Sequence, residues 1–570
     1  MNMPGGAPQT LRPFLWRAEH LYPETEIVSR TAGGIERYDY AAYADRVAQL
    51  ANALDEAGVE EGDRVGTVCW NDHWHFETYF AVPNRGSQLH TINPLLPDHH
   101  LQYIVENAED RVLFVDATLL EAVEAAYDPE AFESVEQFVV TGDRVPHTDL
   151  EPVVDYESFV EGHPATYDWP DLDEDQPAGM CYTSGTTGKP KGVEYTHQML
   201  WSHTMATLTP QGVPAADDDV VMPVVPMFHV NAWGFPFSMT AAGSKHVYPG
   251  PSPDPADLAG LIEQEGVTLT AGVPTVWLGL MEHCKEHEVD LSSLERVVVG
   301  GSAAPEAMIR WFDEHDVELL HAWGMTEMSP IGSVAHLKSD LQDADEGTKL
   351  DKRTKQGLMV PGLEFRVIDE NGEEVEWNSA ERRSADSRAA EPRDDGEDFG
   401  ELWVRGPWVT QEYYRRPEAN EADFEDGWLK TGDIVTVDED GYLKIVDRAK
   451  DVIKSGGEWI SSVELENAIM AHDGVAEATV IGVPHDRWQE RPVAFVVPTD
   501  EADRPTVEDE VLAMVREEFP DWWVPDDVMY VDEIPKTATG KFDKKVLREE
   551  YDDESLVEGK VPEEAAPEDD

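Results

Sequence analysis

YDYAAYADRVAQLANALDEAG, residues 38–58, is followed closely by GDRVGTVCW, residues 62–70, and the two stretches have different patterns. In the first, apolar residues recur at helical spacing as far as Gly58, a residue type that often ends a helix. The second is a short apolar run of the kind found in buried strands. A helix followed by a buried strand indicates an α/β fold.

The same alternation continues to about residue 446. Three more apolar runs, VVMPVVPM (220–227), VTLTAGVP (267–274) and RVVVGG (296–301), lie between amphipathic segments. This order predicts α/β layers with substantially parallel sheets. We therefore expect residues 1–446 to form a large N-terminal domain of several subdomains, with layered α/β sheets and a β-rich portion.

Other parts of the chain differ in composition. Residues 378–398 contain almost no large apolar group, so we expect an exposed, mobile insertion between two strands. Residues 447–552 are expected to form a small α+β C-terminal domain, and residues 553–570 an acidic disordered tail. Residues 438–441 are expected to form only a tight turn.

The chain is strongly acidic. It has 43 Lys and Arg residues against 117 Asp and Glu residues, a formal net charge of −74. Self-repulsion of this size destabilises a compact state in dilute buffer, whereas at molar salt the Debye length falls to about 3 Å. Because the acids are spread along the chain, we expect a salt-adapted, halophilic protein. Such a surface is unfavourable for binding nucleic acid.

Cysteine content and hydropathy indicate a cytoplasmic protein without a membrane segment. Cys69, Cys181 and Cys284 are far apart and form no CxxC pair, which argues against a disulfide framework or a zinc site. No apolar run approaches the roughly 18 residues that span a bilayer. The first residues lack the basic and apolar segments of a secretion signal.

Residues 182–192 (YTSGTTGKPKG) combine glycines, hydroxyl groups and two lysines. Backbone N–H and side-chain O–H groups in such a loop can converge on phosphate oxygens, and Lys189 and Lys191 add positive charge. A flexible surface loop is the plainer alternative, but two lysines in so acidic a chain argue against it. The P-loop pattern does not fit, because Gly185 and Gly188 are three residues apart and Pro190 follows Lys189.

The glycine-rich loop resembles the corresponding motif of the adenylate-forming superfamily, which includes acyl-CoA synthetases, luciferases and peptide-synthetase adenylation domains. The resemblance extends from about Tyr38 to Tyr551, with the motifs in the family's order. It implies that ATP and AMP bind to this loop, to GGSAAP (300–305), HAWGMTEMSP (321–330) and GWLKTGD (427–433), and to the end of PKTATGK (535–541). The nucleotide-binding residues so implied are Thr183, Ser184, Gly185, Thr186, Thr187, Gly188, Lys189, Lys191, Gly301, Ser302, Ala303, His321, Ala322, Trp323, Gly324, Met325, Thr326, Asp433, Arg448 and Lys541.

The resemblance also implies individual roles. Trp323 stands where tyrosine is more usual and would stack on the adenine, while Glu327 and Thr183 would bind Mg²⁺. Asp433 would accept hydrogen bonds from the ribose hydroxyls, and Lys541 would contact the reacting α-phosphate and the substrate carboxylate. A core tryptophan and a solvated glutamate are the structural alternatives for Trp323 and Glu327.

The second half of the reaction is implied by later motifs. Asp447 and Lys450 match the hinge about which the C-terminal domain of the family rotates between adenylation and thioester formation. The residues expected to bind coenzyme A are Lys454, Ser455, Gly456, Gly457 and Trp459. Two windows, 444–454 and 536–548, hold four basic residues against two acidic ones and five against one, which suits the polyanions ATP and coenzyme A.

PMFHVNAWGFPFSM, residues 226–239, is similar to the segment that lines the acyl tunnel in the family. His229 would lie near the activated carboxylate, and Val230, Trp233, Phe235 and Gly301 would contact the acyl chain. Peptide-synthetase relatives carry an aspartate in this segment to bind an α-ammonium group, and none is present here. With SGGEWISS (455–462) and HDRWQERP (485–492), the resemblance is greatest to medium- and long-chain fatty acyl-CoA synthetases.

The resemblance therefore implies an AMP-forming fatty acid:CoA ligase that acts through an acyl-adenylate and does not insert stably into membranes. Its catalytic residues would be Lys541, His229, Thr183 and Glu327, and whether it forms a homodimer stays open. Three alternatives remain: a ligase for short-chain or aromatic acids, an enzyme that passes the acyl-adenylate to a carrier protein, and a non-catalytic nucleotide-binding relative.

Overall fold

The computed structural model describes residues 6–183, 189–375, 377, 399–455, 458–472, 474–485, 487–499, 504–536 and 542–552. The predicted insertion and tail lie outside these residues, as do Ser184–Gly188, Gly456, Gly457 and Lys541 of the predicted site. The chain forms two compact units. Within the described residues, the first unit runs to residue 377 and adds Gly400–Thr431 and Thr436–Ile445; the second holds Phe399, Gly432–Val435 and the residues from Val446.

A seven-stranded sheet carries the glycine-rich segment at its edge. Its order is β7 (Val153–Asp155), β6 (Gln137–Thr141), β5 (Asp110–Asp116), β3 (Arg64–Val68), β4 (Gln88–Thr91), β8 (Pro177–Tyr182) and β9 (Gly192–Thr196). Neighbouring strands are parallel from β7 to β8, and β8 and β9 form an antiparallel pair. The glycine-rich segment therefore connects the last two strands of this sheet.

A nine-stranded sheet carries two more predicted nucleotide motifs, residues 300–305 and 321–330. Its order is β16 (Leu358–Met359), β15 (Ile331–Val334), β14 (Glu318–Gly324), β13 (Arg296–Val299), β12 (Leu269–Gly272), β10 (Val220–Pro223), β11 (Lys245–Tyr248), β1 (Glu26–Thr31) and β2 (Gly34–Asp39). The strands from β14 to β1 are parallel, with antiparallel strands at both edges. The three apolar runs predicted as strands are β10, β12 and β13, so the α/β prediction is confirmed.

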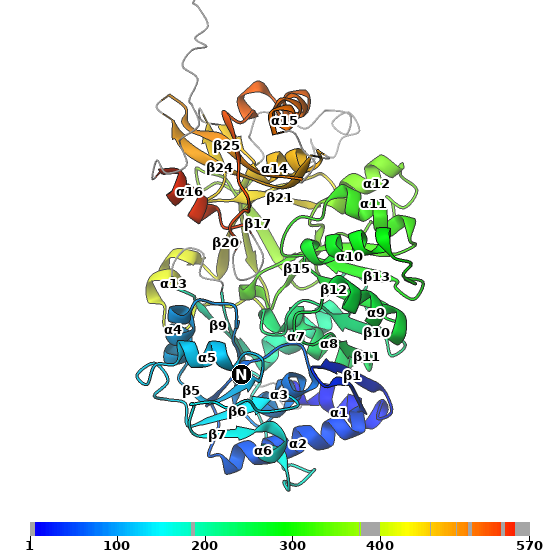
Figure 1. Ribbon diagram of the computed structural model, residues 1–570, viewed down its shortest axis with the longest axis vertical. Coiled ribbons are helices and arrows are strands. Elements are labelled where there is room, and N and C mark those ends of the chain that lie inside the picture. Colours follow the sequence, from blue (N-terminus) through cyan, green and yellow to red (C-terminus); the bar gives the residue numbers. More distant parts are fainter. Residues whose placement is uncertain are drawn as a thin grey trace, which may run out of the picture. The chain divides into compact units, whose positions relative to one another are not determined.

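Helices lie beside these sheets (Figure 1). They are α1 (Arg12–Leu21), α2 (Tyr40–Glu56), α3 (His73–Asn84), α4 (Asp98–Ala108), α5 (Leu120–Ala126), α6 (Tyr156–Val160), α7 (His197–Thr207), α8 (Phe235–Ala242), α9 (Pro255–Glu265), α10 (Pro274–Glu286), α11 (Glu306–Glu314) and α12 (Glu346–Thr354). The side chain of Asp39 caps α2 by accepting a hydrogen bond from the Ala42 N–H, and Gly58 follows α2 at a φ of +79°. Local capping thus agrees with the sequence pattern.

A smaller five-stranded sheet, in which β17 is antiparallel to β18 and β19 to β20, forms the predicted β-rich portion. Its order is β17 (Glu364–Ile368), β18 (Gly400–Arg405), β20 (Trp428–Val437) and β19 (Phe424–Glu425), and β21 (Leu443–Arg448) also pairs with β20. Helix α13 (Pro417–Asp423) precedes β19.

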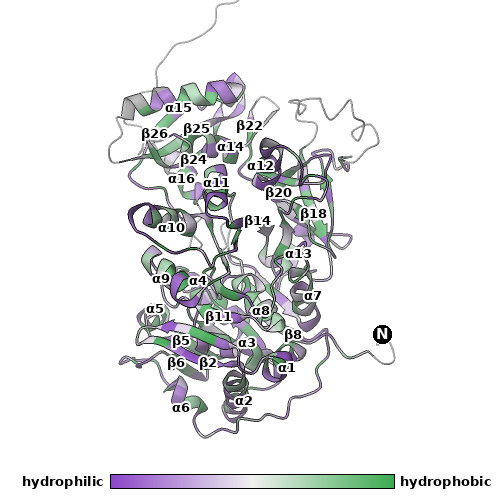
Figure 2. Ribbon diagram, turned by 90° about the vertical axis from the view of Figure 1, so that its right-hand side faces the viewer, coloured by the Kyte–Doolittle hydropathy of each residue, from purple (hydrophilic) through white to green (hydrophobic). Residues whose placement is uncertain are grey.

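The second unit has its own sheet and core. The strand order is β23 (Glu458–Ile460), β22 (Ile453–Ser455), β25 (Gln489–Pro498) and β24 (Val475–His485), with β26 (Asp527–Tyr530) parallel to β25. Its helices are α14 (Ser462–Met470), α15 (Arg504–Glu518) and α16 (Lys544–Asp552). Val507, Val511 and Val515 of α15 are buried in this core, and Figure 2 shows hydrophilic and hydrophobic residues alternating along the helix.

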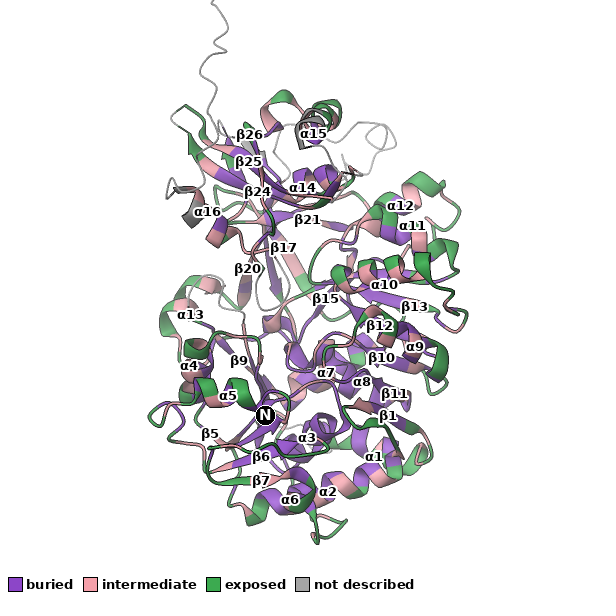
Figure 3. Cartoon of the chain, in the orientation of Figure 1, coloured by how far each residue is buried: buried purple, intermediate pink, exposed green. Residues whose placement is uncertain are grey.

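Burial follows the layers. Figure 3 shows buried strands such as β12 and β13 beside helices that carry exposed residues, such as α10 and α11. Short 3₁₀ segments occur at Thr326–Met328 and Asp521–Trp523, the first of them within a predicted site motif. Val230–Gly234 forms a short left-handed turn within the predicted acyl segment. Within the described residues, no helix has both the length and the apolar character needed to cross a membrane.

Candidate functional site

The base of the glycine-rich hairpin is closed by Thr183 and Lys191. The Thr183 N–H donates to the Lys191 carbonyl at 3.0 Å, and the Lys191 N–H donates to Thr183 Oγ1 at 3.1 Å. Gly192 follows them, and a Cβ there would lie 3.0 Å from the Tyr182 ring, which would have to shift to admit a side chain. Thr183 thus has a fixed place at the entrance of the loop.

The two lysines of the loop already contact protein side chains. Lys189 Nζ lies 4.7 Å from the centroid of the Tyr103 ring. Lys191 Nζ lies 2.5 Å from Asp423 Oδ2 and 4.5 Å from the centroid of the Tyr413 ring. The contact of Lys189 and Lys191 with phosphate stays a prediction. A bound phosphate would have to share these lysines with Tyr103, Asp423 and Tyr413.

Glu327 lies on the 3₁₀ segment after β14 and is 6% exposed. Its Oε1 accepts a hydrogen bond from the Tyr413 hydroxyl at 2.8 Å, and its carbonyl accepts one from the Thr410 N–H at 2.8 Å. The neighbouring Thr326 carbonyl accepts from the hydroxyl of Tyr195, a residue of β9, at 2.7 Å. The acidic segment and the glycine-rich hairpin are therefore joined in one network.

This arrangement fits a magnesium ion of the kind that accompanies ATP. Mg²⁺ takes hard oxygen ligands and is commonly held by one or two carboxylates together with substrate phosphates. Glu327 is a single carboxylate with one oxygen engaged by Tyr413, and within the described residues no group of three or more His, Cys, Asp or Glu could hold a metal without such help. Binding of Mg²⁺ by Glu327 and Thr183 stays a prediction.

Trp323 is largely buried, with 8% of its surface exposed. One side of its indole is covered by Gly332, where a Cβ would come within 2.5 Å of the ring. The next residue, Gly324, approaches the Pro330 carbonyl so closely that a Cβ would clash with it, and the Met325 N–H donates to the same carbonyl at 3.1 Å. Stacking of Trp323 on adenine stays a prediction.

His321 connects the 300–305 loop to the end of α12. Burial lowers its pKa to about 4, so the ring is neutral at neutral pH. Its Nδ1 therefore donates to the Thr354 carbonyl at 3.0 Å, which leaves Nε2 to accept from the Ala304 N–H at 3.4 Å. The expected adenine residues of this loop begin at Gly301, which has a φ of +83°.

The acyl segment contains a strained backbone. Val230, Asn231, Ala232 and Trp233 follow one another at φ values of +38°, +60°, +46° and +57°, a left-handed run without glycine. Each such residue costs on the order of 1–2 kcal/mol, and strain of this kind concentrates at functional sites. Gly234 continues the run at +80° and lies against His203, which a Cβ would approach to 2.5 Å.

The predicted acyl-binding residues occupy different environments. Val230 and Phe235 are 3% and 1% exposed and belong to the main hydrophobic core of the first unit. Trp233 and His229 are half-buried. The Trp233 indole lies against Gly300, where a Cβ would come within 3.2 Å of it. Trp233 is therefore the residue that connects the acyl segment with the 300–305 loop.

In the second unit, the predicted ribose residues form an ion pair. Arg448 Nε lies 2.9 Å from Asp433 Oδ1, and Asp433 is 2% exposed. The adjacent Asp447 accepts a hydrogen bond from the Ser462 N–H at 2.9 Å, and burial raises its pKa. Lys450 is exposed. Asp447 is thus fixed to the start of α14, whereas Lys450 lies on the surface.

The described part of the predicted coenzyme A site lies on β22 and β23. Lys454 is exposed and pairs in register with Trp459, and its N–H donates to Glu490 at 2.9 Å. The Ser455 hydroxyl accepts from Arg491 at 3.2 Å. The residues between the two strands lie outside the described part of the chain.

Some basic residues of the two lysine-rich windows serve the fold. Lys544 lies 2.7 Å from Glu466, and Arg548 lies 2.8 Å from Asp451. Lys536 pairs with Glu477 at 2.5 Å. Part of the positive charge that the sequence assigned to polyanion binding is therefore neutralised by acids of the same unit.

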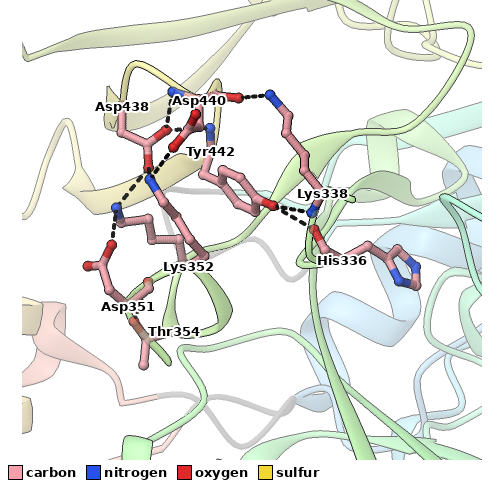
Figure 4. Close-up of polar contacts among 9 residues, drawn as sticks. His336, Lys338, Asp351, Lys352, Thr354, Asp438, Asp440 and Tyr442 are labelled. Carbon is pink, nitrogen blue, oxygen red and sulfur yellow. Dashed lines mark hydrogen bonds and ion pairs between the residues drawn. The ribbon is translucent and has the colours of Figure 1, made fainter. Parts of the chain in front are cut away.

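Residues 438–441 form the predicted tight turn, in which the Gly441 N–H donates to the Asp438 carbonyl at 2.9 Å, and the acids of this turn also pair with lysines. Figure 4 shows Lys352 pointing toward Asp438, with its Nζ 2.7 Å from Asp438 Oδ2. The Nζ of Lys355 lies 2.9 Å from the same oxygen. Lys352 also lies 3.0 Å from Asp440. The buried Tyr442 donates its hydroxyl to the His336 carbonyl at 2.9 Å. These contacts could not be predicted from local sequence patterns, because the lysines lie more than 80 residues away.

Sequence reasoning also missed Tyr413 and Asp423. Neither belongs to a quoted motif, and Tyr413 is separated from Glu327 by 86 residues. The one available signal is the aromatic pair at Tyr413 and Tyr414 before the α13 helix, which does not by itself indicate a site.

Comparison with known proteins identifies the family. The family model described as AMP-binding enzyme matches residues 15–414, and the model described as AMP-binding enzyme C-terminal domain matches residues 464–541.

Three relatives match almost the whole chain. A long-chain-fatty-acid–CoA ligase of Thermus thermophilus is 44% identical over 94% of this chain and 95% of its own length. A 3-methylmercaptopropionyl-CoA ligase of Ruegeria pomeroyi is 42% identical over 96% of this chain and 98% of its own. A medium-chain-fatty-acid–CoA ligase of Ectopseudomonas oleovorans is 38% identical over 93% of each chain.

Solved structures agree on the fold. An anthranilate CoA ligase in complex with anthranoyl-AMP has a TM-score of 0.82 at 23% identity and covers 95% of this chain and 97% of its own. ATP-bound MatB from Rhodopseudomonas palustris has a TM-score of 0.78 at 26% identity, covering 96% of this chain and 99% of its own. The chain therefore belongs to the AMP-binding enzyme family, and its resemblance to the adenylate-forming superfamily is confirmed.

Proposed function

We propose that this chain is an ATP-dependent fatty acid:CoA ligase that forms acyl-CoA through an acyl-adenylate and releases AMP and pyrophosphate. The observation that carries the proposal is the network that joins the glycine-rich hairpin to Glu327 through Lys191 and Tyr413. A phosphate-binding loop and a metal-binding carboxylate held in one network suit phosphoryl chemistry on ATP.

In the first step, an oxygen of the substrate carboxylate attacks the α-phosphorus of ATP, and the bond to pyrophosphate breaks. The carboxylate is already ionised, so positioning and neutralisation of charge are what the protein supplies. Bound Mg²⁺ would neutralise phosphate charge as a Lewis acid, held by Glu327 and Thr183. In the second step, the thiol of coenzyme A attacks the acyl carbon, and AMP leaves.

The relatives support a fatty acid as substrate. The proteins at 44% and 38% identity are named for long-chain and medium-chain fatty acids. The segment from Phe228 to Trp233 contains no acidic residue that could bind a substrate ammonium group. A short thioether acid is the second candidate, because the relative at 42% identity is named for 3-methylmercaptopropionate.

A substrate series separates the two candidates. Thioester formation is measured with ATP, Mg²⁺ and coenzyme A in 2 M KCl, with saturated acids of 4 to 16 carbons and 3-methylmercaptopropionate. The proposal expects kcat/KM to be highest for an acid of medium or long chain. A maximum at butyrate or 3-methylmercaptopropionate would contradict it, and AMP release without coenzyme A consumption would favour a carrier protein as acceptor.

Lys541 is proposed as the residue that contacts the α-phosphate and carboxylate during adenylation. Lys541→Ala is expected to abolish acid-dependent exchange of pyrophosphate into ATP while sparing thioester formation from preformed acyl-adenylate. Equal loss of both half-reactions would contradict this division, which rests on rotation of the C-terminal domain about Asp447 and Lys450.

We also propose a salt-rich cytoplasm as the working environment. The net charge of −74 supports it, as do the three cysteines, which form no disulfide. The midpoint temperature of thermal unfolding and the enzymatic activity are both expected to rise between 0.1 and 2 M KCl. A fall in both would refute salt adaptation. Light scattering at the same salt concentrations tests whether the chain forms a homodimer.

A further inference from the structure

Tyr413 lies between the glycine-rich hairpin and Glu327. Its hydroxyl donates to Glu327 Oε1 at 2.8 Å, and the centroid of its ring lies 4.5 Å from Lys191 Nζ. Tyr413 is 3% exposed and Glu327 6% exposed, so the contact between them is shielded from solvent, whereas the Lys191 side chain keeps 28% of its surface exposed. One aromatic side chain therefore contacts both parts of the proposed nucleotide site.

The position of Tyr413 is itself fixed. Its N–H donates to Asn420 Oδ1 at 2.7 Å, and Asn420 Nδ2 donates back to the Tyr413 carbonyl at 3.1 Å. The ring packs on Phe424 at 5.4 Å between centroids. Such reciprocal bonds leave the tyrosine little freedom to follow a moving carboxylate.

Glu327 is held at two points. The Thr410 N–H fixes its main chain, and the Tyr413 hydroxyl occupies Oε1. Among the residues that the structure describes, none forms a hydrogen bond or ion pair with Glu327 Oε2. An ionised carboxylate has several acceptor positions, so a bond on one oxygen orients the other without blocking it.

Lys191 lies over the ring of Tyr413. Its ammonium group is paired with Asp423 at 2.5 Å and lies over the Tyr413 ring, and its main chain closes the hairpin with Thr183. A cation over an aromatic face is attracted to it, more strongly when both are shielded from water. The Lys191–Asp423 pair thus holds the tyrosine and the loop entrance together.

We infer that Tyr413 is a positioning residue for metal–nucleotide binding: its hydroxyl fixes the rotation of the Glu327 carboxylate, and the Lys191–Asp423 pair fixes its ring. The inference rests on the proposed ATP-dependent activation of a carboxylic acid. It assigns Lys191 a role at the base of the loop in addition to any contact with phosphate.

The test compares Tyr413→Phe with Tyr414→Phe. The Tyr414 ring lies beside Arg64 and Arg415, at 4.5 and 4.8 Å from their guanidinium carbons, and serves as the matched control. Binding of Mn²⁺ in the presence of a non-hydrolysable ATP analogue is measured by electron paramagnetic resonance. We expect the Mn²⁺ dissociation constant to rise about tenfold in Tyr413→Phe, because a hydrogen bond to a charged group is lost, and to stay unchanged in Tyr414→Phe.

Two further measurements separate the outcomes. Thioester formation from preformed acyl-adenylate is expected to be equal in both variants, and Asp423→Asn is expected to raise the Mn²⁺ dissociation constant about threefold. Equal Mn²⁺ binding by Tyr413→Phe, Tyr414→Phe and wild type would overturn the inference. If Tyr413→Phe fails to fold, an unchanged dissociation constant in Asp423→Asn overturns it instead. A wild-type protein that forms no acyl-CoA from any acid refutes the proposed function, a result distinct from all of these.

Discussion

Two clusters of lysine and acid in the first unit differ in how completely their charges are matched. In the cluster of Figure 4, Lys352 and Lys355 share Asp438, and Lys352 also reaches Asp440. In the cluster at the hairpin, Lys191 pairs with Asp423, but the Glu327 carboxylate accepts a hydrogen bond from the neutral hydroxyl of Tyr413.

The difference separates a structural cluster from a functional one. A buried acid whose charge is matched by lysines contributes to the fold, whereas an acid held in place by a neutral donor retains charge for an incoming cation. Substitutions in the two clusters should therefore affect different quantities: activity at Glu327, stability at Asp438.

The largest expected effect is on activity, from Glu327→Gln. Loss of the negative charge removes a ligand for the metal, so acid-dependent exchange of pyrophosphate into ATP is expected to fall about 100-fold. The free energy of unfolding should change by less than about 1 kcal/mol, because the amide oxygen of glutamine can still accept the Tyr413 hydroxyl and the side-chain volume is kept. A loss of activity below tenfold would contradict the assignment of Glu327.

Asp438→Ala is expected to act on stability. It leaves two lysines without their acid and removes the acceptor for the Asp440 and Tyr442 N–H groups, so the free energy of unfolding should fall by about 3 kcal/mol. Guanidinium unfolding measures the loss, and kcat of the folded fraction should not change. A variant as stable as wild type but with reduced kcat would reverse the comparison.

The stabilities of wild type and Asp438→Ala can also be compared as a function of pH. Burial raises the pKa of Asp438, but the attraction of Lys355 and the hydrogen bonds from Lys352 and Lys355 outweigh it, so the pKa is lowered. The stabilisation is thus present above the unfolded-state pKa of about 3.9 and is lost as the pH falls through the folded-state pKa. The difference between wild type and Asp438→Ala should shrink as the pH falls below about 4.

His321→Phe tests the link between the 300–305 loop and α12, the helix that carries Lys352. His321 bonds to Ala304 of the loop and to Thr354 at the end of the helix. Removing both hydrogen bonds should cost about 2 kcal/mol at pH 7. The folded-state pKa of about 4 lies below the unfolded value near 6.5, so the contribution of His321 is present above pH 6.5 and is lost on acidification toward pH 4. The two proteins should therefore converge in stability between pH 7 and pH 4.5, and a constant difference would contradict a neutral His321.

The smallest effect is expected from Lys352→Met. Asp438 keeps Lys355, at 2.9 Å, while Asp440 loses its lysine, so we expect a loss of about 1.5 kcal/mol, the size of one hydrogen bond to a charged group. Thermal unfolding of Lys352→Met beside Asp438→Ala checks the order. A larger loss in Lys352→Met would show that Lys355 does not hold Asp438.

The sequence predicted those parts of the protein that depend on local pattern. Helix α2 and strands β10, β12 and β13 follow from apolar spacing, and the glycine-rich loop follows from its unusual composition. Tyr413 and the partners of Asp438 could not be predicted, because pairing across 80 or more residues depends on how strands and helices pack. Charge counting also assigned Lys544 and Arg548 to polyanions, although Glu466 and Asp451 lie beside them.

The central claim is that the carboxylate oxygen attacks the α-phosphorus of ATP, and oxygen labelling tests it most directly. A fatty acid labelled with ¹⁸O in both carboxyl positions is converted in the presence of ATP, Mg²⁺ and coenzyme A, and the products are analysed by mass spectrometry. An acyl-adenylate leaves one ¹⁸O in AMP and one in acyl-CoA. Label in orthophosphate together with formation of ADP would contradict the account.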